Sequence, residues 1–393
     1  MNIKSFLVLL ILVLLCHSTI IFGMNCLQYG KMKTFRLHGG FKGHGSSTND
    51  IKFCPNGKYI VSTGQDETVK ISNVLTGKCK KIFPYKEFRG MVVLSHNGKY
   101  AALRGNEKNI KLLDLKTGKY IKNFTGHRGE IKSMGFSHDD KYIVSIAEKE
   151  IVIKIWNIET GKYVKAYPDR SENEICLVVF SCDDKYVIEV GEDCTISFYD
   201  SKTGHHKKSK RLLDIYLETA SLTNDCKYLA MCFSGKISIF ALNVSLLEFE
   251  HVKTFKAYDK KSYDLEIILI SFSPDNTRIA IASDKGIIKI FDRETYTCIK
   301  MIKPLLLAGY VRSLKFVRGN LNFSYIFKSA NERKDEVESV TSLAFSPDNK
   351  YLAAGMHDGT VRVWGVFFED FHRNILFLRE NNIFVDTQIK FAD

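Results

Sequence analysis

The 393 residues are enough for one large domain or two ordinary ones. Hydrophobic residues make up 45% of the chain and charged residues 26%, a globular composition that excludes a mostly disordered protein. The formal net charge of +13 favours acidic partners such as nucleic acid, anionic membranes or acidic proteins, although a lysine-rich proteome would produce the same excess without any such partner.

The first 23 residues differ in composition from the rest of the chain. Lys4 precedes an uninterrupted apolar run over residues 6–15, and the small residue Gly23 ends the segment. A basic head, an apolar core and a small residue are typical of a secretory signal peptide, and the run is short for a bilayer span. We therefore expect export to a periplasmic or secreted location, with cleavage near Gly23. A membrane anchor is one alternative, and a true start at Met24 with a cytoplasmic protein is another.

The ten cysteines are irregularly spaced and include no Cys-x-x-Cys pair. This spacing predicts neither a zinc site nor a redox motif. A chain of this length can bury a large core, so we expect no disulfide framework either.

One short segment recurs seven times along the chain. Six of its copies carry a lysine at the same position, and the remaining copy carries Thr277 there. The six lysines are Lys58, Lys99, Lys141, Lys185, Lys227 and Lys350. The first five intervals between aligned residues run from 41 to 50, and the last is 73. A period just above forty is typical of four short strands per repeat, as in a propeller blade.

The repeat over residues 131–167 illustrates the predicted strands. Residues 131–136 alternate and predict an inner strand, residues 142–146 a strand buried on both faces, residues 151–156 a third strand and residues 163–167 an outer strand. Polar and Gly-containing turns separate them. We find no convincing amphipathic helix between residues 30 and 370, so the predicted class is all-β.

Seven repeats predict a single closed seven-bladed β-propeller of four-stranded antiparallel blades over residues 33–366, followed by a tail over residues 367–393. Residues 33–37 can supply the missing outer strand of the last blade, and residues 375–378 are the alternative. The long last interval places an extra segment at residues 303–337. We interpret it as an insertion rather than a decayed partial blade. The similar segments 311–316 and 340–345 begin only 29 residues apart, which is too short for four strands.

Two Gly-His pairs, Gly43-His44 and Gly126-His127, stand where blades begin, and Trp156-Asn157 and Trp364-Gly365 end two third strands. With the segment 345–364, these motifs resemble those of the WD-repeat family. Most other blades depart from the pattern because they lack the Gly-His pair or the Trp.

The resemblance implies a hydrogen-bonded set in each matching blade, formed by a buried His, a strand Ser or Thr, a turn Asp and the Trp. The fullest set here is His127, Ser145 and Trp156, with Glu148 or Glu150 in place of the Asp. The corresponding residues that we select in other blades are His44, Asp66, Asp358 and Trp364. Buried polar groups must be paired, so we expect these residues to have a structural role.

Motifs for catalysis were sought and not found: the sequence has no glycine-rich phosphate loop, no zinc-protease motif and no nucleophile elbow. The WD-repeat resemblance therefore implies a non-catalytic scaffold, one monomeric ring that binds other proteins without cofactor or metal. We expect the partner site on the face that carries the insertion. Its candidate residues are Arg128, Glu130, Phe323, Tyr325 and Phe327.

The repeated lysines predict a basic face, since turns on one side of six of the seven blades carry them. Lysine is also common in this turn among the proteins that the chain resembles. Two alternatives follow for function: a propeller that binds nucleic acid or anionic membrane through this face, or an exported propeller enzyme.

Overall fold

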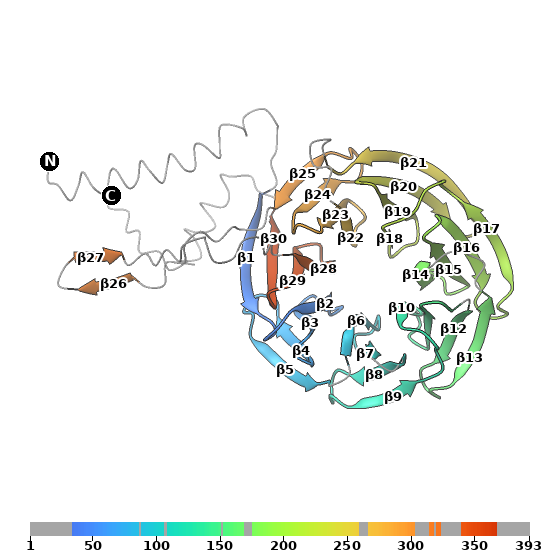
Figure 1. The fold of residues 1–393 in the computed structure, drawn as a ribbon, viewed down its shortest axis with the longest axis horizontal. Coiled ribbons are helices and arrows are strands. Elements are labelled where there is room, and N and C mark those ends of the chain that lie inside the picture. The colour runs from blue at the N-terminus through green and yellow to red at the C-terminus, as the bar shows by residue number, and fades with distance from the viewer. Residues whose placement is uncertain are drawn as a thin grey trace. The chain divides into compact units, whose positions relative to one another are not determined.

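The computed structural model describes residues 34–85, 88–105, 108–150, 152–168, 175–258, 266–302, 314–317, 320–323 and 339–367. The chain divides into one large unit, residues 37–365, and a second unit made of residues 1–36 and 366–393. In the large unit, seven four-stranded antiparallel sheets form a ring (Figure 1). The prediction of a seven-bladed β-propeller is confirmed. The signal-peptide segment lies outside the described residues, and its role stays a prediction.

The strands of blades 1 to 4, from the inner to the outer position, are β2 (Thr48–Phe53), β3 (Tyr59–Gly64), β4 (Thr68–Asn73) and β5 (Cys79–Pro84); β6 (Phe88–Leu94), β7 (Tyr100–Gly105), β8 (Ile110–Asp114) and β9 (Tyr120–Phe124); β10 (Ile131–Phe136), β11 (Tyr142–Ala147), β12 (Val152–Asn157) and β13 (Tyr163–Pro168); and β14 (Ile175–Phe180), β15 (Tyr186–Gly191), β16 (Thr195–Asp200) and β17 (His206–Arg211).

The strands of blades 5 to 7, in the same order, are β18 (Thr219–Leu222), β19 (Tyr228–Phe233), β20 (Lys236–Asn243) and β21 (Glu248–Lys256); β22 (Ile267–Phe272), β23 (Arg278–Ser283), β24 (Ile288–Asp292) and β25 (Cys298–Ile302); and β28 (Val340–Phe345), β29 (Tyr351–Met356), β30 (Thr360–Phe367) and β1 (Thr34–Lys42).

The ring closes through β1, which is hydrogen-bonded to β30 at the outer edge of blade 7. The first strand of the chain thus completes the last blade. This arrangement ties the two ends of the ring together within one sheet, so that no blade is left incomplete. Residues 375–378, the alternative closing segment, lie outside the described residues.

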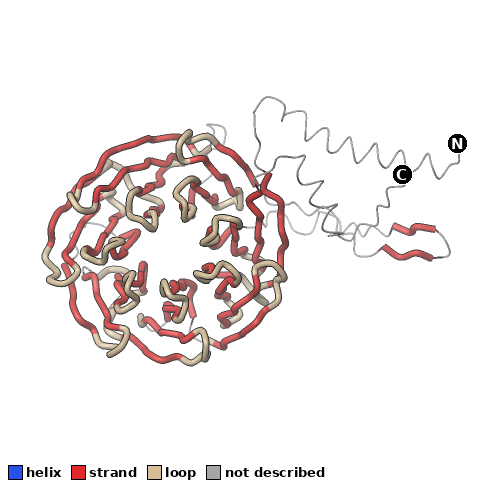
Figure 2. The backbone as a smooth tube through the Cα atoms, turned by 180° about the vertical axis from the view of Figure 1, so that it is seen from behind, coloured by secondary structure: helices blue, strands red, loops and turns tan. Residues whose placement is uncertain are grey.

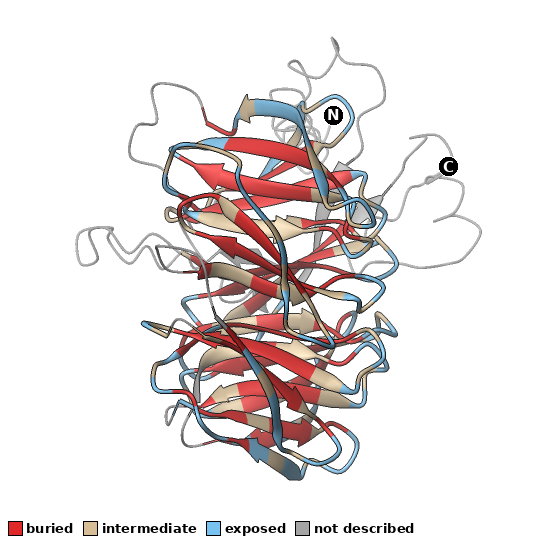
Figure 3. Cartoon of the chain, turned by 90° about the vertical axis from the view of Figure 1, so that its right-hand side faces the viewer, coloured by how far each residue is buried: buried red, intermediate tan, exposed pale blue. Residues whose placement is uncertain are grey.

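Burial decreases from the second strand of a blade to its outer strand (Figure 3). In blade 3, five of the six residues of β11 are buried, whereas Tyr163 and Val164 at the start of β13 are exposed. A strand between two partners that also packs against both neighbouring blades has no face open to water, which is why its sequence is continuously apolar rather than alternating. The core therefore lies between blades.

The turn between the inner and second strands has the same backbone in every blade. Its fourth residue has a positive φ, from +55° at Asp140 to +67° at Gly57 and Gly98. Asp, Asn and Gly tolerate this left-handed conformation best, which explains the polar turn signal in each repeat. Figure 2 shows these turns and the outer ones around the ring.

The topology gives the ring two faces. We call the side with the turns between inner and second strands, and between third and outer strands, the turn face. The opposite side carries the hairpins between second and third strands and the connections from each outer strand to the next inner strand, and we call it the crossover face.

The segment between β25 and β28 contains one described hairpin. β26 (Leu314–Val317) and β27 (Asn320–Phe323) pair with each other, with Leu314 opposite Phe323. Neither of these two strands is hydrogen-bonded into a blade. The eight cysteines in the described ranges are all free thiols.

Candidate functional site

The blade 3 set forms a continuous chain of hydrogen bonds. His127 precedes β10, Ser145 lies in β11 and Trp156 in β12. The Nε2 atom of His127 is 2.7 Å from Ser145 Oγ, and the Trp156 indole N–H donates to the same Oγ at 2.8 Å. The Nδ1 atom of His127 contacts the carboxylate of Glu150. A neutral imidazole protonated on Nδ1 satisfies all three contacts, because Ser145 then donates to Nε2 and accepts from the indole.

Glu150, rather than Glu148, takes the place of the usual Asp in this blade. Its carboxylate also accepts the backbone N–H of Arg128 and lies 3.1 Å from the Lys154 ammonium. Lys154 in turn donates to the carbonyl oxygen of Gly126 at 2.6 Å. The carboxylate thereby fixes the whole connection that carries His127.

Blade 1 repeats the arrangement without a Trp. His44 Nδ1 is 2.8 Å from Asp66 Oδ1, and its Nε2 is 2.9 Å from Ser62 Oγ. Lys70 lies 3.2 Å from the Asp66 carboxylate and donates to the Gly43 carbonyl, as Lys154 does in blade 3. Sequence reasoning missed both lysines, although each follows its carboxylate by four residues.

The remaining two residues selected for the network do not assemble into a third set. Asp358 accepts the backbone N–H and the hydroxyl of Thr360, at 2.8 and 2.6 Å, and so caps its own hairpin. Trp364 is buried in blade 7 opposite Leu352. Ala354 occupies the position that Ser145 holds in blade 3, so this blade lacks the central hydroxyl.

The environment keeps the two histidines neutral and the two carboxylates charged. Burial lowers the pKa of His127 and of His44, although the neighbouring acids oppose this shift. Burial alone would raise the pKa of Asp66, but hydrogen bonds from Thr68, Gly45 and His44 hold it well below its usual range. The pKa of Glu150 is lowered in the same way, against burial, by the hydrogen bonds from Arg128 and His127. Ser62 and Ser145 are fully buried, and these groups hold the backbone of their own blades together.

The predicted basic turn lysines all lie exposed on the turn face. Four of them pair with an Asp two residues earlier in the same turn: Lys141 with Asp139 at 3.1 Å, Lys185 with Asp183 at 3.2 Å, Lys227 with Asp225 at 3.4 Å and Lys350 with Asp348 at 3.7 Å. Lys58 and Lys99 have no ion pair within the described part of the chain. The ring of lysines is thus not uniformly cationic.

The predicted partner residues are only partly within the described structure. Arg128 and Glu130 are exposed in the connection between β9 and β10, on the crossover face. Phe323 is the last residue of β27. Tyr325 and Phe327 lie outside the described residues.

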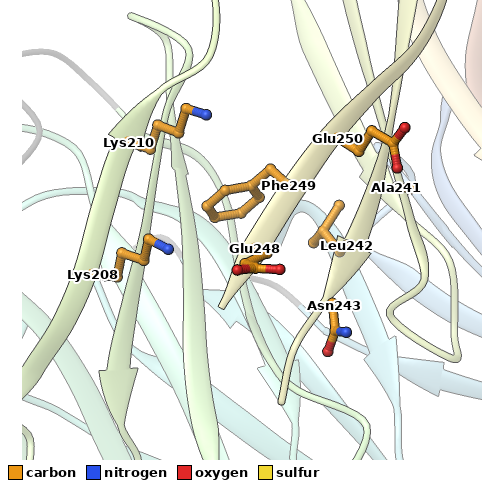
Figure 4. A pocket seen from close by; sticks show the side chains of 8 residues that line it. All are labelled: Lys208, Lys210, Ala241, Leu242, Asn243, Glu248, Phe249 and Glu250. Carbon is orange, nitrogen blue, oxygen red and sulfur yellow. The ribbon is translucent and has the colours of Figure 1, made fainter. Parts of the chain in front are cut away.

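A cleft that the sequence did not indicate lies between blades 4 and 5 (Figure 4). Lys208 and Lys210 of β17 line one side, and the hairpin of β20 and β21, with Phe249 and Glu250, lines the other. Register places Lys210 opposite Ile196, the position at which Tyr167 stands opposite Ile153 in blade 3.

The cleft coincides with that substitution. In blade 1 and blade 3, the aromatic ring of Phe83 or Tyr167 covers a glycine in the next blade's outer turn, Gly118 or Gly204. The outer turn of blade 5 has no glycine, and Lys210 stands in place of the aromatic residue. The cleft lies at this seam.

No three His, Cys, Asp or Glu side chains in the described ranges are grouped so that they could hold a metal ion. The same ranges contain no helix with the length and hydropathy needed to cross a membrane.

Comparison with known proteins places the repeats in a family. The model of the family "WD domain, G-beta repeat" matches residues 35–72, 118–157 and 333–365. The chain is 21% identical over 248 residues to Autophagy-related protein 16 of Arabidopsis thaliana, a match that covers 63% of this chain and 41% of that protein. It is 23% identical over 279 residues to Eukaryotic translation initiation factor 3 subunit I of Drosophila willistoni. This match covers 62% of this chain and 84% of that protein.

A third relative is WD repeat-containing protein AAC3 of Dictyostelium discoideum, 24% identical over 177 residues, covering 44% of this chain and 36% of the relative. The matched region thus spans less than half the length of the first and third relatives. Two of the three matched stretches, residues 35–72 and 118–157, include the His, Ser and carboxylate side chains that are hydrogen-bonded in blades 1 and 3. From the repeat matches, the seven-bladed ring and these two networks together, we conclude that the chain belongs to the WD-repeat family of β-propellers.

Proposed function

We propose that the protein is a non-catalytic scaffold that binds other proteins through its crossover face. The observation that carries this proposal is the use made of its polar side chains. In blades 1 and 3 the buried histidines and serines are hydrogen-bonded to each other, and the histidines also contact half-buried carboxylates. The connections between strands are the parts of the ring that face solvent. On rigid scaffolds, binding residues commonly lie in such connections.

The connection before β10 presents exposed charged side chains on a backbone held by hydrogen bonds. Its Arg128 backbone N–H is held by Glu150, and the carbonyl of Glu130 accepts the N–H of Glu148 at 2.7 Å. The exposed side chains of Arg128 and Glu130 are thus presented by a fixed backbone. Binding to such a fixed loop costs less conformational entropy than binding to a mobile loop, which must become ordered. Phe323, Tyr325 and Phe327 of the insertion are proposed to add aromatic anchors on the same face.

The relatives agree with a scaffold role. One is named as a subunit of a translation initiation factor, and another carries only a WD-repeat name. Neither name identifies a partner for this chain, so the proposal states the class of partner and its binding face.

Partner capture with charge-swapped variants tests the proposal. The full chain, immobilised, is compared with Arg128→Glu combined with Glu130→Lys, and bound proteins are identified by mass spectrometry. The matched control is Glu159→Lys combined with Lys162→Glu, which swaps two exposed charges on the turn face of the same blade. We expect the first variant to lose partners that the control retains. Equal capture by wild type and both variants would rule out the crossover face at this blade.

The insertion is tested separately. Replacing residues 328–337 with a short Gly-Ser linker should leave the ring folded, because loop length changes stability only slowly. If the folded variant captures every partner of the parent chain, the insertion is not part of the binding site. Loss of partners without loss of thermal stability supports its inclusion.

A further inference from the structure

A group of unpaired cations occupies the turn face of blades 1 and 2. We call these residues the lysine patch: Lys58, Lys78, Lys80, Lys99, Lys116 and Lys119. All six side chains are exposed. Across the described part of the chain, none of the six forms an ion pair, in contrast to the paired lysines of blades 3, 4, 5 and 7.

One residue in the turn between the inner and second strands determines whether the lysine of that turn has an ion pair. In blade 3, Asp139 accepts the Ser137 hydroxyl and the backbone N–H of Lys141, and it also pairs with the Lys141 ammonium. In blades 1 and 2 the same position is Asn56 or Asn97. Their amide oxygens accept the N–H groups of Lys58 and Lys99 at 3.0 and 2.8 Å. Asn therefore makes the same backbone hydrogen bond as the Asp but offers the lysine no carboxylate within its own turn.

The outer turns of the same blades also contain more lysines than carboxylates. Residues 73–78 contribute Lys78 and no carboxylate, and residues 114–119 contribute two lysines and Asp114. Asp114 is the only acidic residue in the four turns of these blades, and its Oδ1 already accepts the backbone N–H groups of Lys116 and Thr117 at 2.9 and 2.7 Å. Folding of the turns does not require this excess of positive charge.

The chemistry of the patch favours one kind of partner. Every cation in it is a lysine, a compact point charge without the directional fork that arginine uses on individual phosphates. The two nearest half-buried rings, Tyr59 and Tyr100, are covered by the ammonium groups of Lys80 and Lys99, whose Nζ atoms lie 4.5 and 4.9 Å from the ring centroids. These rings are not open for stacking of nucleic-acid bases, the contact on which single-strand binding depends.

An apolar side chain stands among the lysines. Leu75, in the outer turn of blade 1, is 59% exposed. Lysines around an exposed Leu match an anionic bilayer, where the cations meet the headgroups and the Leu enters the boundary with the acyl chains. We propose that the lysine patch binds the surface of anionic lipid membranes, which leaves the crossover face free for protein partners.

The test measures partition of the full chain onto phosphatidylcholine vesicles with and without phosphatidylserine. Neutral vesicles give the baseline because the apolar segment 6–15 could contribute to binding on both kinds. The decisive variant is Asn56→Asp combined with Asn97→Asp, which installs the residue that blades 3, 4, 5 and 7 already use. We expect wild type to prefer phosphatidylserine, and this variant to lose roughly tenfold or more of that preference, since each lysine near such a surface is worth roughly fivefold.

The matched variant is Asp139→Asn combined with Asp183→Asn, which alters the same turn position in the opposite sense. It should bind at least as tightly as wild type, and the thermal midpoints of both variants should stay close to that of wild type. Leu75→Ser should weaken partition without changing its salt dependence. Equal binding of wild type to both vesicle types, or an undiminished preference in the Asn-to-Asp variant, would overturn the proposal. So would tighter binding of a single-stranded RNA that the Asn-to-Asp variant abolishes, since the patch would then be a nucleic-acid site.

Discussion

Ser145 is the central hydroxyl of the blade 3 network, and its removal tests whether that network stabilises the ring. Ser145→Ala leaves the Nε2 atom of His127 and the indole N–H of Trp156 without their partner. Both side chains are buried, with 7% and 2% of their surfaces exposed. A buried polar group left unsatisfied costs about 1–3 kcal/mol, so the loss of a partner by two groups should lower the free energy of unfolding by about 2–6 kcal/mol.

The equivalent change in blade 1 provides the control. Ser62→Ala removes the partner of His44 Nε2 only, because Ser72 stands at the position of the Trp. Its cost should be about 1–3 kcal/mol. Urea unfolding followed by tryptophan fluorescence suits the comparison, since the two tryptophans of the chain, Trp156 and Trp364, lie in blades 3 and 7. Equal destabilisation by the two substitutions, or none from Ser145→Ala, would refute the argument that the shared hydroxyl satisfies two groups.

Three further predictions concern the same ring. Trp156→Ala should lower the free energy of unfolding by roughly 3–5 kcal/mol because it deletes a buried aromatic side chain, and an unchanged urea midpoint would contradict it. Burial holds the pKa of His44 and His127 below the ordinary 6.5, so below that pH the unfolded chain binds protons that the folded chain does not. Stability should therefore fall on acidification by up to about 1.4 kcal/mol per pH unit for each histidine until its folded pKa is reached, and His127→Gln should reduce the slope. Lys210→Tyr should fill the cleft between blades 4 and 5 as Tyr167 fills the seam before it, and raise the free energy of unfolding by about 1 kcal/mol; a lower thermal midpoint would show that the seam cannot accept a ring.

The repeats of the sequence were sufficient to predict the seven-bladed ring, whereas the hydrogen-bonded set of blade 3 was implied by the WD-repeat resemblance. Strand alternation, turn residues and the position of His127 recur at fixed spacing, and each has a physical consequence within its own blade. The choice between Glu148 and Glu150 was left open, since it depends on how the hairpin after β11 turns and which carboxylate then points at His127. The roles of Lys70 and Lys154 were missed because each lysine contacts a backbone carbonyl that is distant in sequence, in the connection before its blade.

Features that arise between blades were harder to predict. The cleft at Lys210 lies where an aromatic residue is replaced, and only strand register shows that Phe83, Tyr167 and Lys210 occupy one position. The predicted basic ring overlooked the pairing of Lys141 with Asp139 two residues earlier, although both are visible in the repeat. Their ion pair depends on the tight backbone of the turn, with its left-handed residue at Asp140. Charge counted along the sequence was therefore a poor guide to charge on the surface.

Hydrogen–deuterium exchange on a complex of the full chain with a captured partner tests the scaffold proposal most directly. Binding through the crossover face predicts added protection in the connection that carries Arg128 and Glu130 and in the hairpin after β11, with exchange unchanged in the turns that contain Lys141 and Lys162. Protection confined to the turn face, with none in the connection before β10, would contradict the proposal.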